Sequence, residues 1–223
     1  MTKFIPLFLV IILPVTIFAL TMIIAYKGKH TDKLTIYEMK KCEKDICLDL
    51  EKDFEGFRVK DQKRNAHYLN TYALAEALKL KIIEDGNISE KNRGQLDEPD
   101  ELEYNGTIKY RKDKDKIDKY AVNFDIIHEI MHYILDVGKG NKVAQSFPRF
   151  HHGYQRGHRE QIIDYYAAAV AIPKDDLIAL LRDKEISLCD DIYDNRVISE
   201  LMDIYKQPRD TVIRRIKEVL VLQ

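Results

Sequence analysis

The chain has 223 residues, which suits one ordinary domain with an appendage. Hydrophobic residues make up 45% and charged residues 33% of the chain, a globular balance that argues against disorder. The formal net charge of −1 gives no general reason to expect a nucleic-acid partner. The three cysteines, Cys42, Cys47 and Cys189, do not form the pattern of a disulfide framework. We interpret them as free thiols in a reducing compartment, with a Cys42–Cys47 disulfide as the alternative.

The first segment, residues 4–26, contains no charged side chain. As a helix it would span roughly 34 Å, which is enough to cross the hydrocarbon core of a bilayer. We therefore predict a transmembrane anchor in residues 1–27. A cleaved signal peptide is the alternative, but its apolar core is normally shorter and is followed by a small-residue cleavage site. Lysines follow the span at Lys27, Lys29 and Lys33, so the positive-inside rule predicts a single-pass protein of the cell membrane with a cytoplasmic C-terminal domain.

The next segments lead up to the central helix. Residues 28–62 are dense in charge and predict a juxtamembrane linker with some helix, outside the core. Residues 64–82 predict one amphipathic helix, because apolar side chains recur there at helical spacing: Tyr68, Leu69, Tyr72, Ala75, Leu78 and Ile82. Residues 85–105 are polar and predict a loop. Residues 107–110 alternate in polarity and predict a strand at a sheet edge.

The segment from Asn123 to Leu135 contains the pattern His-Glu-x-x-His, with His128, Glu129 and His132. Apolar residues flank the pattern at helical spacing, so it is predicted to lie on a buried helix. Two histidines four positions apart share one helix face and can bind the same metal ion. Glu129 is turned by about 100° from His128, which suits a base that acts on water beside the metal. The alternative is a pair of ordinary core histidines.

A catalytic zinc site needs a third protein ligand and one open position. The next apolar helix begins near Glu160 and ends before Pro173. Glu160 and Asp164 are four positions apart and share a face of that helix. We predict Glu160 as the third ligand and Asp164 as the acceptor of a hydrogen bond from a ligand histidine. The alternative is that Glu160 is a solvated acid at the start of a helix.

These two segments resemble the ImmA/IrrE family of zinc metallopeptidases. The likeness rests on the His-Glu-x-x-His helix and on the downstream glutamate, whose helix is rich in alanine and closes at Ile172-Pro173. The spacing of Glu160 and Asp164 is also similar to that in thermolysin-type peptidases. The resemblance implies Zn²⁺ bound by His128, His132 and Glu160, with Glu129 catalytic and Asp164 behind the ligands. It also implies a zincin-like α+β fold, mostly helical with a small sheet, over residues 63–223.

The loop between His132 and Glu160 is rich in histidine. It contains His151, His152 and His158, together with Tyr154 and Arg156. A histidine here could replace Glu160 as a ligand, and these side chains could also stabilise an oxyanion. The plainer interpretation, a polar surface loop that lines a cleft, is the one we favour.

Two helices are predicted near the C-terminus, at residues 195–205 and 209–222, within a helical pair of about 190–223. Their apolar pattern is similar to a helix-turn-helix, and Arg209, Arg214, Arg215 and Lys217 add positive charge that could contact DNA phosphates. The family resemblance implies instead that the pair closes the peptidase domain. We favour that packing role and expect no nucleic-acid partner.

The sequence therefore predicts a membrane-anchored, zinc-dependent endopeptidase. Because relatives of this kind cleave repressor proteins in the cytoplasm, the resemblance implies a protein substrate of the regulator type. Two other functions stay open: a zinc-binding regulatory module without turnover, and a membrane-attached transcription regulator.

Overall fold

The computed structural model describes residues 34–45, 50, 54–61, 66–88, 94–99, 101–111, 120–137, 157–183 and 194–222. Among these residues, no helix is long and apolar enough to cross a membrane. The predicted anchor in residues 1–27 lies outside them. So do Cys47, Cys189 and the loop residues His151, His152, Tyr154 and Arg156.

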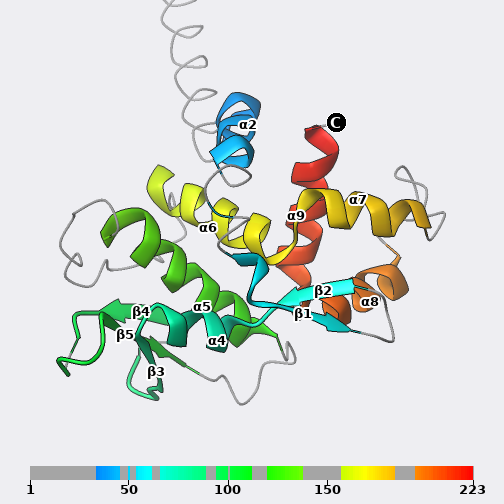
Figure 1. Cartoon of the computed structure of the whole chain (residues 1–223). Coiled ribbons are helices and arrows are strands. Elements are labelled where there is room, and N and C mark those ends of the chain that lie inside the picture. The colour runs from blue at the N-terminus through cyan, green and yellow to red at the C-terminus, as the bar shows by residue number, and fades with distance from the viewer. Residues whose placement is uncertain are drawn as a thin grey trace, which may run out of the picture.

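The described part is a mostly helical α+β fold with small sheets (Figure 1). The helices are α2 (Ile36–Asp45), α4 (Thr71–Ala77), α5 (Ala121–His132), the π-helix η2 (Tyr133–Val137), α6 (His158–Ala171), α7 (Lys174–Asp183), α8 (Asn195–Tyr205) and α9 (Arg209–Val221). The predicted helices around the His-Glu-x-x-His pattern, around Glu160 and near the C-terminus are therefore confirmed. Pro173 ends α6, because proline cannot donate a hydrogen bond to the preceding turn.

Two small sheets accompany the helices. Strands β1 (Arg58–Asp61) and β2 (Ala66–Leu69) form an antiparallel pair, from Arg58 opposite Leu69 to Asp61 opposite Ala66. The second sheet has the order β3-β5-β4, with β3 (Leu80–Glu84) parallel to β5 (Gly106–Tyr110) and β4 (Gly94–Asp97) antiparallel to it. The predicted strand at 107–110 is confirmed, but its edge position is wrong, because β5 pairs on both sides. The predicted loop at 85–105 is wrong at β4, whose Leu96 lies against the core and pairs with Ile108.

The single helix predicted over residues 64–82 is wrong at both ends. Only α4 is helical there: the Asn70 side chain accepts a hydrogen bond from the Ala73 N–H at 3.2 Å and so caps its first turn. Lys79, with a φ of 55°, turns the chain out of the helix into β3. The apolar positions at 68 and 69 belong to β2, and the one at 82 belongs to β3. Strand residues on either side of a short helix had reproduced a helical spacing.

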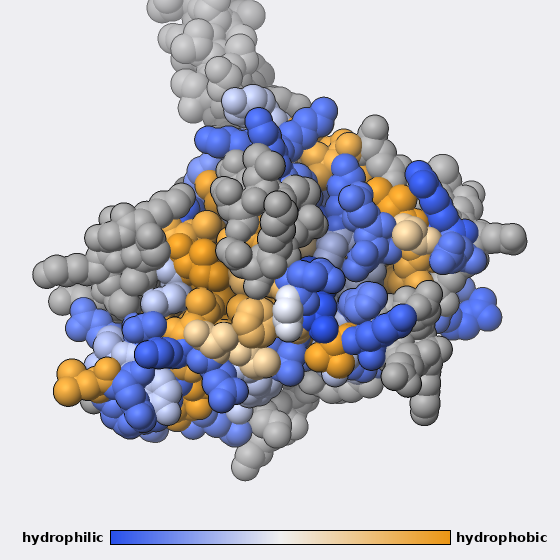
Figure 2. Space-filling view, in the orientation of Figure 1, coloured by the Kyte–Doolittle hydropathy of each residue, from blue (hydrophilic) through white to orange (hydrophobic). Residues whose placement is uncertain are grey.

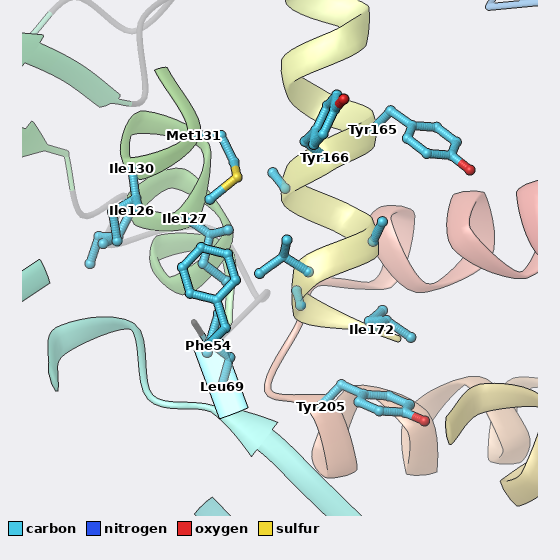
Figure 3. Close-up of a cluster of buried hydrophobic side chains, with 14 of the residues drawn as sticks. Phe54, Leu69, Ile126, Ile127, Ile130, Met131, Tyr165, Tyr166, Ile172 and Tyr205 are labelled. Atoms are coloured by element: carbon cyan, nitrogen blue, oxygen red, sulfur yellow. The ribbon is translucent and has the colours of Figure 1, made fainter. Parts of the chain in front are cut away.

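The core is centred on α5 and α6, which pack against each other (Figures 1 and 3). Ile126, Ile127, Ile130 and Met131 of α5 are fully buried. The alanines of α6 are buried too, and their small side chains allow the two helices to lie close together. On the face shown in Figure 2, apolar patches lie among hydrophilic side chains at the surface.

Part of the predicted linker belongs to this core. Cys42 of α2, Leu50 and Phe54 are buried among the core residues, although the sequence placed residues 28–62 outside the core. These apolar residues are spaced widely among charged ones, so they gave no periodic signal. The domain boundaries themselves stay a prediction.

Candidate metal centre

Helix α5 presents both histidines of the His-Glu-x-x-His pattern toward α6. His128 and His132 are each 5% exposed, and their ring centroids lie 4.9 Å apart. The two Nε2 atoms are separated by 3.1 Å. The spacing of four residues places the two rings one turn apart on one face of α5, edge to face, and both are buried.

Glu160 closes the third side of the site from the first turn of α6. Its Oε2 lies 3.3 Å from His128 Nε2, and its Oε1 lies 3.3 Å from His132 Nε2. The Glu160 side chain is 22% exposed, so this side of the cluster reaches solvent. Burial by itself would raise the pKa of the Glu160 carboxyl, but hydrogen bonds and charge attraction from the two histidines outweigh it and hold that pKa well below its ordinary value. The convergence of these three residues, expected from the sequence, is what the structure shows.

The three side chains fit one zinc ion. Each offers one ligand atom, and these atoms lie within 4.8 Å of one another. Two ligands bound at 2.0–2.1 Å with tetrahedral angles would be about 3.3 Å apart. The observed separations of 3.1 Å and 3.3 Å match that spacing. Two imidazoles and a carboxylate are also a donor set that zinc prefers in catalytic sites.

A carboxylate lies behind each histidine. The Nδ1 of His128 is 2.8 Å from Asp164 Oδ1, the contact that the sequence predicted for a ligand histidine. The Nδ1 of His132 is 3.1 Å from Asp136 Oδ2, a contact that the sequence analysis missed. A histidine that donates its Nδ1–H to a carboxylate has its Nε2 lone pair free for a metal. The available signal for Asp136 was its position four residues after His132, on the same helix face.

An arginine contacts each of these carboxylates. Arg214 of α9 places Nη1 3.2 Å from Asp164 Oδ2 and donates from Nη2 to the Asp164 carbonyl at 3.1 Å. Its guanidinium lies over the Phe124 ring, 5.3 Å from the centroid. Arg159 of α6 pairs with Asp136 Oδ1. The sequence analysis assigned neither arginine to the site, because each one meets its carboxylate only through the packing of separate helices.

The two remaining predicted residues take different positions. Glu129 is 4% exposed, on the same turn of α5 as the histidines. His158 points its Nε2 at Glu38 of α2, 2.9 Å from Oε1. The cluster that could hold a metal is thus completed by Glu160, and His158 does not replace it.

The comparison with known protein families agrees with this geometry. Residues 109–217 match the family model Peptidase_M78, described as the IrrE N-terminal-like domain. The matched region contains His128, Glu129, His132 and Glu160. No curated protein and no solved structure matches the chain. Residues 109–217 are therefore similar to an IrrE N-terminal-like domain, and the chain is a metallopeptidase of the type with a downstream glutamate ligand.

Proposed function

We propose that this metallopeptidase, which is similar to an IrrE N-terminal-like domain over residues 109–217, binds Zn²⁺ through His128, His132 and Glu160 and hydrolyses peptide bonds with Glu129 as the general base. The observation that carries the proposal is the meeting of three side chains from two helices, whose nitrogen and oxygen atoms lie 3.1 Å and 3.3 Å apart. Such a site needs deliberate support, because burying two imidazoles and a carboxylate without partners would be costly. The partners are present behind both histidines.

A bound zinc ion would supply Lewis acidity, which lowers the pKa of water and polarises a carbonyl group. Glu129 directly follows His128 on α5 and is not one of the three residues of the candidate cluster, which suits a base beside the proposed centre. In that position it can accept a proton from the attacking water and deliver it to the leaving amine nitrogen. Its burial supports this role, because a carboxylate surrounded by little water keeps its proton-accepting oxygen oriented.

Asp164 and Asp136 would orient the ligand histidines. Each accepts from an Nδ1 atom, so that each imidazole presents Nε2 to the centre. Asp164 is itself held by Arg214 at both its side chain and its backbone. Asp164 of α6 therefore supports the ring of His128 directly, and Arg214 of α9 supports it indirectly by holding Asp164.

Because the enzyme is a peptidase, its substrate is a protein. We further propose that the substrate is a repressor-type regulator, on the strength of the family resemblance. A membrane anchor in residues 1–27 would place the domain at the cytoplasmic face of the cell membrane, which suits such a substrate.

The test compares the full chain with Glu129→Gln. Both proteins are purified, their zinc content is measured, and each is incubated with a mixture of denatured proteins. New amino termini are then counted by mass spectrometry. We expect about one zinc per chain in both proteins and cleavage by the wild type alone, at a rate at least 100-fold above that of the variant.

Two results would contradict the proposal. A wild-type chain that binds no zinc would remove the site, and a variant that cleaves as fast as the wild type would remove the role of Glu129. If the variant also kept the biological activity of the chain in cells, the non-catalytic regulatory module would be the better description.

A further inference from the structure

The contact between Asp136 and Arg159 joins the two helices that supply the metal ligands. Asp136 lies on η2, which continues directly from the His-Glu-x-x-His helix. Arg159 lies on the first turn of α6, next to Glu160 in the chain. Their ion pair therefore connects the end of one ligand-bearing helix to the start of the other.

Asp136 contacts a ligand histidine as well as the arginine. Its Oδ2 is 3.1 Å from His132 Nδ1, while its Oδ1 is the atom that Arg159 contacts. The Asp136 side chain is 14% exposed, and that of His132 is 6% exposed. Because each oxygen has its own partner, the carboxylate can hold the ring and the arginine at the same time.

The start of α6 has no side-chain cap, although His158 in its first turn pairs with Glu38 of α2. The N-cap of α6 is Gly157, which makes no side-chain capping hydrogen bond. A helix start without a cap is prone to fray, and here the first turn carries Glu160. The pairing of Arg159 with Asp136 fixes that turn against η2, next to the atoms that must converge.

We propose that Asp136 and Arg159 are positioning residues of the metal centre: Asp136 fixes the ring of His132, and Arg159 fixes Asp136 while it holds the first turn of α6 in place for Glu160. This inference rests on the proposed function, since it concerns the same metal site. It concerns the His132 side of the site, whereas Asp164 contacts His128 and Arg214 contacts Asp164.

The alternative is an ordinary surface ion pair, which would also be partly exposed to solvent. The Arg159 side chain is 43% exposed, and exposed pairs contribute little to the stability of a fold. The two interpretations differ in what the residues act on. Removing either residue of a surface pair would leave the metal affinity unchanged. Removing either residue of a positioning pair would weaken metal binding, and the effect of the arginine would depend on the presence of Asp136.

The experiment measures zinc affinity of the full chain by competition with a chelating indicator, without reference to activity. We expect Asp136→Asn to weaken zinc binding about 10-fold, as loss of a carboxylate behind a ligand histidine does. Arg159→Gln is expected to weaken it about 2- to 5-fold, because the arginine is partly solvated. In the Asp136→Asn background the arginine substitution should have no further effect. Arg159→Lys, which keeps the charge, should recover most of the affinity.

Arg182→Gln is the matched control, since Arg182 is an exposed arginine near the end of α7. It should leave the affinity unchanged. The visible absorption spectrum of the Co²⁺-loaded chain supplies a second readout, because an altered His132 ring orientation changes the ligand field. Thermal unfolding of each metal-free variant checks that the fold is intact.

The outcomes separate this inference from the proposed function. A wild type that binds no zinc contradicts the proposed function. A wild type that binds zinc beside an Asp136→Asn variant of equal affinity and equal Co²⁺ spectrum contradicts the inference alone. An Arg159→Gln effect of the same size with and without Asp136 shows that the arginine does not act through that carboxylate, and this also overturns the inference.

Discussion

Replacing Glu218 by glutamine tests the charge balance beneath the metal site. Glu218 of α9 lies 3.7 Å from Arg214 Nε and 3.6 Å from Arg215 Nη1, and its side chain is 13% exposed. Burial raises the pKa of Glu218 from 4.5 to about 7, against the attraction of the two arginines. Glu43 of α2 pairs with Arg215 at 2.6 Å and, as a like charge, raises the pKa of Glu218 further.

The sign and size of the effect follow from that pKa. Since the folded pKa of Glu218 lies above the unfolded value, the folded state binds the proton more tightly. The resulting stabilisation is fully present below about pH 4.5 and is lost as the pH rises through about 7. The difference between 4.5 and about 7, at 1.36 kcal/mol per pKa unit, corresponds to about 3 kcal/mol. Glutamine has the shape of the protonated acid and does not ionise.

We therefore expect Glu218→Gln to match the wild type near pH 4 and to exceed its free energy of unfolding by up to about 3 kcal/mol above pH 8. Urea unfolding of the full chain, followed by circular dichroism across this pH range, measures the difference. Taking the difference at each pH cancels the titration of groups shared by both proteins. Glu76→Gln, at an exposed position of α4, controls for removal of a surface carboxyl. A variant that is less stable than the wild type above pH 8, or a difference that does not change with pH, would refute the reasoning.

Two further substitutions test the backbone and the packing. Lys79→Gly should raise the free energy of unfolding by up to about 1 kcal/mol, as urea unfolding measures it, because glycine removes about 1–2 kcal/mol of left-handed strain at φ 55° and adds about 0.5–1 kcal/mol of unfolded-state entropy. Lys206→Gly, at the same φ, should gain less, because the Lys206 ammonium lies over two tyrosine rings at 5.6 Å and 5.7 Å; equal gains would contradict this account. Ala168→Leu should lower stability by about 1–3 kcal/mol and weaken zinc binding in the indicator assay, because Ala168 is fully buried one turn beyond Asp164 on the helix that packs against α5. Ala77→Leu, at an exposed helical position, is its control, and unchanged zinc affinity in the Ala168 variant would show that helix spacing does not govern the site.

The residues of the candidate metal centre could be predicted from the sequence because they lie in two pairs, each with its members close together in the chain. His128 and His132 are four residues apart on one helix, and Glu160 and Asp164 are four residues apart on another. Helix periodicity alone therefore placed each pair on a face. What the sequence left open was whether the two faces meet, and the 3.3 Å separations between Glu160 and the histidines answer that.

The sequence failed where a contact depends on the fold. The spacing of Asp136 after His132 was visible, but a charged residue after a helix is usually solvated, so nothing marked it out. Arg159 and Arg214 contact their partners only because η2, α6 and α9 come together. The strands on either side of α4 were missed for another reason. With only four and five residues, they are too short for an alternating pattern to be distinguished from the helical spacing of the whole segment.

The arrangement of α9 bears on the choice between peptidase and transcription regulator. Among the cations that could contact DNA phosphates, the sequence offered Arg214 and Arg215, and both have partners within the domain. Arg214 holds Asp164 behind a ligand histidine, and the fully buried Arg215 pairs with Glu43 and donates to the Ile172 carbonyl at 3.0 Å. To neutralise a phosphate, Arg214 would have to release the carboxylate that orients His128. A phosphate and Asp164 would thus compete for Arg214, which favours the packing role that we predicted for α9 over a role in DNA binding.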